Sequence, residues 1–524
     1  MKRIRFVRFS ALSGMTTLLS SESAVPVPAL QERARGSAAR TAAQDTSKRR
    51  HTLVSRLAFL TICVMIVMTT LAFGTVHYWA LAVFAATGAG LVCLWCLDGL
   101  TLRSVQLSRN ALQWPLLGMI ILGLVQLLPL RAAADNGGLQ LSLSRALSLD
   151  PNSTRLVLIQ LVSLLIYFSA TLIFTDSPRR LRALTRTIII FGFLLAMFGL
   201  TQSLTTDGTR VYWFRQLTQS TAFGPFINRH HFAGYMELVI ALPLGLLFSG
   251  SIEAHKRPLY AFAALLMAVA LILTNSRGGI ISLVAEILFV IVIAGPGVGH
   301  SEQSRKFALM RTVVPRAVMA LGLGIVLVIG ALAIGGPGVF GRLLGTVNAA
   351  DPTTGRAHFW NVTLDIIKNH PILGSGLGSF SVIYTRYDSG NGLYRLEQAH
   401  NDYLQTLADG GIAGGLLGLS FLILLFGRGF ARRATDDKFR SGVATGALAG
   451  CFAALVHSAF DFTLHTTANA LLFLVLAAMA TLDRRVDEGS THRRRRRHRS
   501  NTTAGVESPA VAAEVPPLTE AKPA

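Results

Sequence analysis

The sequence predicts an all-α polytopic membrane protein with about twelve transmembrane helices and one long polar loop that contains short helices. Three observations carry this prediction. Hydrophobic residues make up 51% of the 524-residue chain and charged residues only 15%, a balance typical of chains that cross lipid. Apolar runs of about 20 residues, long enough to cross the hydrocarbon core as a helix, recur along the chain. One long polar stretch, residues 351–411, interrupts the later runs.

The apolar runs also fit the distribution of charge. Placing the N-terminus in the cytoplasm leaves most of the 49 Lys and Arg residues on the cytoplasmic side, as the positive-inside rule requires. We therefore attribute the net charge of +22 to topology and attraction to anionic lipids, and not to nucleic acid. The candidate spans cover roughly residues 57–74, 78–97, 111–128, 155–174, 185–204, 232–250, 258–274, 278–295, 313–335, 411–427, 441–460 and 467–482.

Composition divides the chain into three parts. Residues 1–56 are basic and rich in Ser, Ala and Pro, too polar for a cleaved signal peptide, and we expect a disordered cytoplasmic extension. Residues 57–482 form the membrane domain. Residues 483–524 include the run Arg493–Arg497 and are expected to form a second disordered, basic cytoplasmic tail. The four Cys residues lie within predicted spans, so no disulfide framework is expected.

The loop after the span 313–335 covers residues 336–410 and is expected on the outer side of the membrane. Long loops in compact membrane domains are usually functional. This loop concentrates Arg, His and Asn between two membrane helices, where a structural connection needs only a short turn. It is predicted to roof an active site that faces out of the cytoplasm.

Two arginines on the outer side are candidate anion-binding residues. Arg binds phosphate bidentately through its planar fork. Arg277, in LTNSRGG, lies in a short turn between spans, followed by two glycines and the start of a helix, which together favour an anion site. Arg356, in TTGRAHFWNV, is expected in the first turn of an interfacial helix, where its charge opposes the macrodipole unless an anion lies nearby. Contact with lipid headgroups is the alternative for both.

His400, in EQAHNDYLQTLADGG, is a candidate general base, because a neutral imidazole near pH 7 can take a proton from a hydroxyl. The segment 397–409 has helical spacing and runs into a break at Gly410-Gly411. Asn401 is a candidate to hydrogen-bond a sugar. Glu397, one predicted turn before His400, is a candidate to orient the imidazole and contact the substrate.

Weaker candidates lie at the ends of other spans. Arg229 and His231, in NRHHFAGY, are candidates for substrate or acceptor contacts. The GSGLGSF run lacks a Walker lysine and follows no strand, so we predict a tight turn instead of a phosphate loop. The motif HSAFDFTLH contains three residues of types that can bind a metal: His457, Asp461 and His465. Nothing in the sequence fixes a tetrahedral geometry, so we favour a hydrogen-bonded polar rim over a metal site. No cofactor is expected.

Four motifs in order resemble the bacterial O-antigen ligase family: SRGG, G-R-x-x-x-W, HP-x-x-G-x-G-x-G-x-F and AHN-x-Y-L-Q. The resemblance covers about residues 220–470. It implies transfer of a glycan from undecaprenyl diphosphate to an acceptor hydroxyl outside the cytoplasm, with inversion and without a metal ion. By residue-to-residue match, Arg277 and Arg356 would bind the diphosphate and His400 would be the base. The loop 336–410 and the active site would then be periplasmic, in a bacterial inner membrane with both termini cytoplasmic.

The motifs leave the acceptor open, because ligases, surface-polysaccharide polymerases and protein O-oligosaccharyltransferases share them. We favour a ligase, with lipid A-core as acceptor, over a polymerase of O-antigen or exopolysaccharide, which would use a second lipid-linked glycan. A transporter or flippase of lipid-linked glycans is the alternative of a different class, which Glu237 and Glu286 inside predicted spans keep open. Transporters often repeat their halves, and no such repeat is seen between 57–250 and 258–482.

Overall fold

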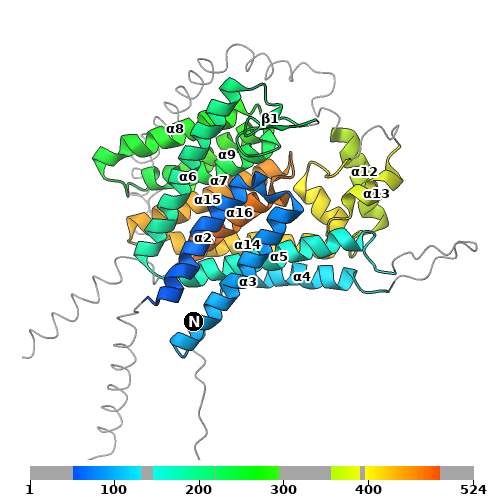
Figure 1. Ribbon diagram of the computed structural model, residues 1–524, viewed down its shortest axis with the longest axis horizontal. Coiled ribbons are helices and arrows are strands. Elements are labelled where there is room, and N and C mark those ends of the chain that lie inside the picture. The colour runs from blue at the N-terminus through cyan, green and yellow to red at the C-terminus, as the bar shows by residue number, and fades with distance from the viewer. Residues whose placement is uncertain (1–50, 131–144, 219, 294–355, 390–395, 484–524) are drawn as a thin grey trace, which may run out of the picture.

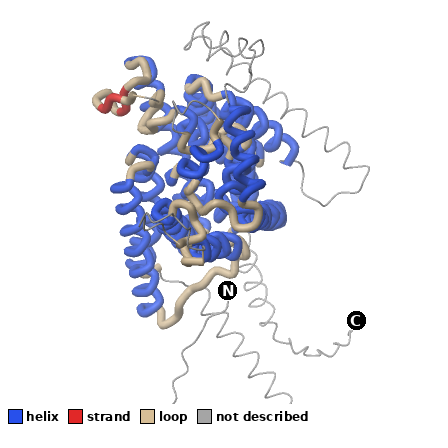
Figure 2. The backbone as a smooth tube through the Cα atoms, turned by 90° about the vertical axis from the view of Figure 1, so that its right-hand side faces the viewer, coloured by secondary structure: helices blue, strands red, loops and turns tan. Residues whose placement is uncertain are grey.

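The computed structural model describes residues 51–130, 145–218, 220–293, 356–389 and 396–483. These residues form helices joined by short turns, which confirms the predicted all-α class. Their one sheet is a hairpin at the margin of the bundle, seen in red in Figure 2, in which β1 (Arg210–Val211) pairs antiparallel with β2 (Arg215–Gln216).

The helices follow the order of the predicted spans. They are α2 (Leu53–Leu71), α3 (Tyr78–Thr101), α4 (Gln113–Gln126), α5 (Pro151–Phe174), α6 (Pro178–Thr205), α7 (Arg229–Phe248), α8 (Arg257–Leu273), α9 (Arg277–Ile293), α12 (Arg356–Asn369), α13 (Phe380–Tyr387), α14 (Asp402–Arg433), α15 (Lys438–Ser458) and α16 (Thr467–Thr481), with 3-10 turns η1 (Phe73–Thr75), η2 (Ala254–Lys256) and η3 (Thr463–His465).

Eight helical segments among the described residues are long and apolar enough to cross a membrane, and α4 and α16 are shorter apolar helices. Every predicted span within the described ranges coincides with a helix. The span 313–335 lies outside the described residues, so the count of twelve stays a prediction. Residues 1–50 and 484–524 of the two basic termini also lie outside them, and α2 begins at Leu53, within the predicted N-terminal extension 1–56. The chain is a multi-pass membrane protein.

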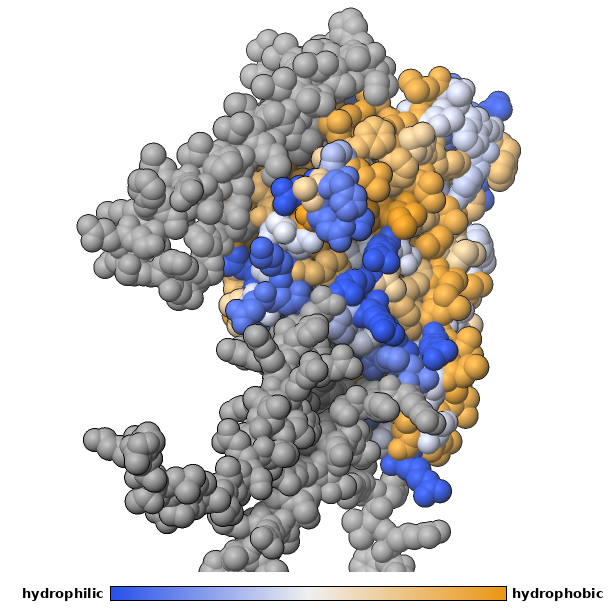
Figure 3. Space-filling model, turned by 90° about the vertical axis from the view of Figure 1, so that its left-hand side faces the viewer, coloured by the Kyte–Doolittle hydropathy of each residue, from blue (hydrophilic) through white to orange (hydrophobic). Residues whose placement is uncertain are grey.

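Helix α7 lies at the centre of the bundle and α3 at its edge (Figure 1): 94% of the apolar window of α7 is buried, against 22% for α3. Helices α7 and α15 approach so closely that a Cβ on Gly245 would lie 2.4 Å from the backbone nitrogen of Gly446. The outer helices leave large apolar side chains exposed, and Figure 3 shows a broad apolar surface beside a patch of polar residues. This surface suits contact with lipid tails.

The long polar loop contains α12 and α13, which lie together at one end of the bundle (Figure 1) and confirm the predicted short helices. The turn between them contains the GSGLGSF run and packs on the start of α14, where the backbone N–H of Ser375 donates to the carbonyl of Ala408 (2.9 Å). Gly376 has a φ of +120°, and a Cβ there would lie 2.2 Å from Ser148 Oγ. The predicted tight turn is therefore confirmed.

Helix α14 breaks at Gly411, as predicted, with φ +62° and ψ −164°. The helix predicted to begin near Glu397 is wrong at its start, because α14 begins at Asp402. Asn401 caps it by accepting hydrogen bonds from the backbone N–H groups of Tyr403 and Leu404. The Asn side chain satisfies N–H donors that have no partner within the helix, which favours a helix start directly after it.

Candidate functional site

The turn between α15 and η3 places Asp461 at the centre of a cluster of basic groups. Its side chain is only 1% exposed. Oδ1 lies 3.1 Å from His400 Nδ1 and accepts a hydrogen bond from the backbone N–H of Phe462 (2.9 Å). Oδ2 lies 3.3 Å from Arg356 Nη2 and 3.7 Å from His230 Nδ1. One carboxylate thus joins residues from four separate parts of the chain.

The charges around Asp461 decide its ionisation. Burial alone would raise the pKa of this carboxyl group, but the hydrogen bond from His400 and the electrostatic interactions with His230, His400 and Arg356 outweigh it and hold the pKa of Asp461 well below its usual range. Asp461 is therefore a carboxylate at neutral pH.

His400 lies just before α14, with about a quarter of its side chain exposed. Its φ of +52° is in the left-handed region, which costs a non-glycine residue roughly 1–2 kcal/mol. The cap at Asn401 on one side and the contact with Asp461 help to hold this conformation. The Nδ1 of a neutral imidazole can donate to Asp461, which leaves Nε2 with the lone pair that a general base needs.

Arg356 is the first described residue of α12, and its place in the first turn stays a prediction because residues 351–355 lie outside the described residues. Its Nη1 donates to the carbonyl of Phe460 and its Nη2 to Asp461. An anion beside this basic residue is therefore supplied by the protein itself. A guanidinium has five N–H donors, and these two contacts use only part of the fork. Arg356 can thus pair with Asp461 and still offer donors to an anionic substrate.

Arg277 lies at the start of α9 with its side chain exposed. The preceding residue, Ser276, is buried and its Oγ lies 2.9 Å from His230 Nδ1. His230 in turn lies 3.7 Å from Asp461. The structure therefore links the turn that carries Arg277 to the carboxylate that contacts Arg356 and His400.

The remaining sequence candidates lie around this cluster. Asn401 uses its Oδ1 as the helix cap and donates from Nδ2 to the carbonyl of Ala459 (3.1 Å). Arg229 begins α7 and is half-buried. His231 is buried against Phe462, with ring centroids 4.9 Å apart.

Glu397 is exposed and precedes the helix instead of lying within it, so it is not one helical turn before His400. The carboxylate that contacts the imidazole is Asp461. Sequence reasoning missed this role and treated Asp461 as part of a polar rim. The available signal was an acidic residue at the end of an apolar span, which is costly unless it has a partner.

The two histidines of the HSAFDFTLH motif, His457 and His465, each contact a carboxylate from another part of the chain. His457 Nδ1 lies 3.0 Å from Glu237 Oε2, and His465 Nδ1 lies 2.6 Å from Asp402 Oδ1. Within the described ranges, no three His, Cys, Asp or Glu side chains are grouped as metal ligands. The favoured interpretation as a hydrogen-bonded rim agrees with this arrangement.

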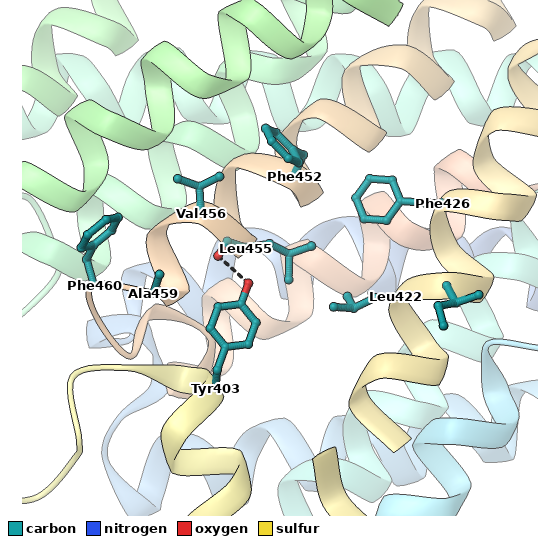
Figure 4. A pocket seen from close by; sticks show the side chains of 9 residues that line it. Tyr403, Leu422, Phe426, Phe452, Leu455, Val456, Ala459 and Phe460 are labelled. Atoms are coloured by element: carbon teal, nitrogen blue, oxygen red, sulfur yellow. Dashed lines mark hydrogen bonds between the residues drawn. The ribbon is translucent and has the colours of Figure 1, made fainter. Parts of the chain in front are cut away.

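An apolar groove of about 670 Å³ opens between α14 and α15 and extends to Phe460, the residue before Asp461. Figure 4 shows Leu422 and Phe426 on one side, Phe452 and Leu455 on the other, and Tyr403 bonded to the carbonyl of Leu455. Phe460 lies at one end of the groove (Figure 4), and its carbonyl accepts the hydrogen bond from Arg356. An apolar path thus leads along the bundle to Phe460, next to the Arg and His side chains around Asp461.

Comparison with known proteins adds one match. A family model described as O-antigen ligase matches residues 262–418, a range that includes Arg277, Arg356 and His400. No curated protein matches the chain.

Proposed function

The chain belongs to the O-antigen ligase family, and we propose that it is a glycosyltransferase which moves a glycan from undecaprenyl diphosphate to an acceptor hydroxyl on the periplasmic face of the inner membrane. The observation that carries this proposal is the cluster on Asp461. It brings a histidine and an arginine together at the end of an apolar groove.

The donor's two parts match the two parts of the site. Its prenyl tail is apolar and suits the groove between α14 and α15. Its diphosphate is anionic and suits Arg356, with Arg277 at the adjoining turn. As the glycosidic bond to the diphosphate breaks, negative charge builds on the leaving oxygen. Fixed positive groups in a site with little water stabilise that charge, and removal of one comparable donor typically costs about 100-fold or more in rate.

His400 is the proposed base. Asp461 holds Nδ1, so Nε2 takes the proton from the acceptor hydroxyl as that oxygen attacks the sugar. General base catalysis of this kind typically contributes about 100- to 10,000-fold. The imidazolium that forms is stabilised by the carboxylate beside it. The diphosphate leaves as the new glycosidic bond forms, so the donor itself supplies the driving force and no nucleotide is needed.

The test is transfer by purified full-length protein from an undecaprenyl-diphosphate oligosaccharide, in EDTA and without ATP. Lipid A-core and a second lipid-linked glycan are offered in separate reactions, so the accepted substrate separates a ligase from a polymerase. We expect transfer by the wild type. No transfer to either acceptor, by protein that binds the donor, would overturn the proposed ligase and polymerase activities. It would favour a protein acceptor or a transporter.

A further inference from the structure

A chain of hydrogen bonds runs through the centre of the bundle beside the proposed site. His457, on α15, contacts Glu237 of α7 through Nδ1 (3.0 Å) and the Oγ of Ser276 through Nε2 (3.4 Å). Ser276 contacts His230 Nδ1 (2.9 Å), and His230 lies 3.7 Å from Asp461. The side chains of Glu237, His457 and Ser276 are all completely buried. None of these three is used in the proposed chemistry.

The hydroxyl of Ser276 couples the two imidazoles. It has one proton, and it already accepts a hydrogen bond from the backbone N–H of Gly279 (3.3 Å). It can donate to only one imidazole nitrogen at a time, so the other must donate to it. The tautomer of His230 therefore depends on that of His457, and Glu237 biases the tautomer of His457 through its contact with Nδ1.

The same contacts account for the residues of the SRGG motif. A Cβ on Gly278 would lie 2.7 Å from Cδ2 of His457, and a Cβ on Gly279 would lie 2.9 Å from Cβ of Ala233. Glycine at these positions lets the turn approach α15 and α7 closely. The serine then reaches both histidines, and Arg277 is held at the start of α9.

His457 also supports the turn that carries Asp461. Its backbone carbonyl accepts hydrogen bonds from the N–H groups of Phe460 (2.8 Å) and Asp461 (3.0 Å). Its side chain reaches Ser276, next to Arg277. One residue thus joins the turn of the carboxylate to the turn of the arginine.

Such a buried polar chain is a poor source of stability, because well-packed apolar side chains often stabilise an interior as well or better. We propose that Glu237, His457 and Ser276 are positioning residues for the transfer reaction: together they fix the turn of Arg277, the imidazole of His230 and the carboxylate of Asp461 relative to one another. This inference rests on the proposed glycosyltransferase function.

Two conservative substitutions break the chain, and each has a matched control. Glu237→Gln keeps the shape but replaces the carboxyl group that contacts His457 Nδ1 by an amide. Glu286→Gln replaces a carboxylate by an amide at a completely buried glutamate of α9 that makes no hydrogen bond to Glu237, His457 or Ser276 among the described residues. Ser276→Ala removes the coupling hydroxyl, whereas Ser282→Ala removes a buried hydroxyl whose one hydrogen bond among the described residues is to the carbonyl of Gly278 (2.7 Å).

The measurement is the transfer rate of purified full-length variants, with kcat, the KM for the lipid-linked donor, and the melting temperature determined separately. We expect Glu237→Gln and Ser276→Ala to lower kcat by roughly 10- to 100-fold, as for small displacements in an active site, while both controls stay close to wild type. The double variant should lose little more than either single variant, because both break one chain.

Unchanged kcat in Glu237→Gln and Ser276→Ala would overturn the inference, as would equal losses in the controls. A lower melting temperature with unchanged kcat would show a structural role only and would also overturn it. These outcomes are read against an active wild type, so they are distinct from failure of the proposed function, in which the wild type itself transfers no glycan.

Discussion

Replacement of Asp461 by asparagine probes the centre of the proposed site with the smallest change of shape. Each carboxylate oxygen faces a group that is always a donor: Oδ1 the backbone N–H of Phe462, and Oδ2 the guanidinium of Arg356. The asparagine amide has one oxygen and one NH2 group. Whichever way it is turned, its NH2 group meets one of those donors, so no orientation satisfies the site.

The two orientations have different chemical consequences. If the NH2 group replaces Oδ1, it faces His400 and donates to Nδ1, which puts the imidazole proton on Nε2 and removes the lone pair needed by the base. If it replaces Oδ2, Arg356 loses its partner. A buried donor left without a partner costs about 1–3 kcal/mol. Loss of base catalysis costs about 100- to 10,000-fold. An Arg356 that has lost its anchor no longer stabilises the leaving oxygen, which typically costs about 100-fold, so with either orientation we expect Asp461→Asn to lower kcat by about 100-fold or more.

The assay is glycan transfer per folded molecule, with Asp402→Asn as the matched control. Asp402 also pairs with a histidine, His465, and accepts from the hydroxyl of Ser458 (2.8 Å), but it makes neither contact with His400 nor with Arg356 among the described residues. Asp402→Asn should therefore leave kcat close to wild type. Equal activity of Asp461→Asn and wild type would refute the proposed role of the carboxylate. Equal losses in Asp461→Asn and Asp402→Asn would show that the loss does not come from the contacts of Asp461 with His400 and Arg356.

Three further predictions concern the neighbouring groups. Arg356→Lys keeps the charge but loses the fork, so kcat/KM should fall about 100-fold; near-normal transfer would remove the proposed contact with the diphosphate. Leu422→Trp narrows the apolar groove, so the KM for a long prenyl donor should rise while that for a short prenyl analogue stays constant; an equal change for both donors would place the tail elsewhere. Burial alone would lower the pKa of His465, but its hydrogen bond to Asp402 and the charge of that residue raise the pKa above its usual value of 6.5. The stabilisation that the protonated imidazole gives is complete below pH 6.5 and is lost as the pH rises through the raised pKa of His465. The difference in melting temperature between wild type and His465→Gln should therefore shrink above pH 6.5. A difference that does not change with pH would contradict this.

Much of the fold could be predicted because its signals are local. Apolar runs of sufficient length predict membrane helices wherever they occur. The break at Gly411 and the tight turn at Gly376 follow from glycine's access to positive φ. Arg356 was expected within a helix of the polar loop, and it lies in α12.

The partners of the site residues could not be predicted in the same way. The contacts of Asp461 with His400 and Arg356 join positions 61 and 105 residues apart, and periodicity carries no information on such pairs. Spacing alone made Glu397 the nearest acidic partner for His400. In the structure the helix begins only after the cap at Asn401, so Glu397 is not one helical turn before His400, and His400 contacts Asp461 in the turn between α15 and η3.

The most direct test of His400 as the base is chemical rescue. His400→Gly removes the imidazole at a position with φ +52°, where glycine is unstrained, so the backbone of this turn should be retained. The melting temperature is measured beside transfer, because Asp461 loses a hydrogen-bond partner. We predict that this variant transfers no glycan on its own and that added imidazole restores transfer in proportion to its concentration. Transfer by His400→Gly at the wild-type rate, without imidazole, would contradict the assignment.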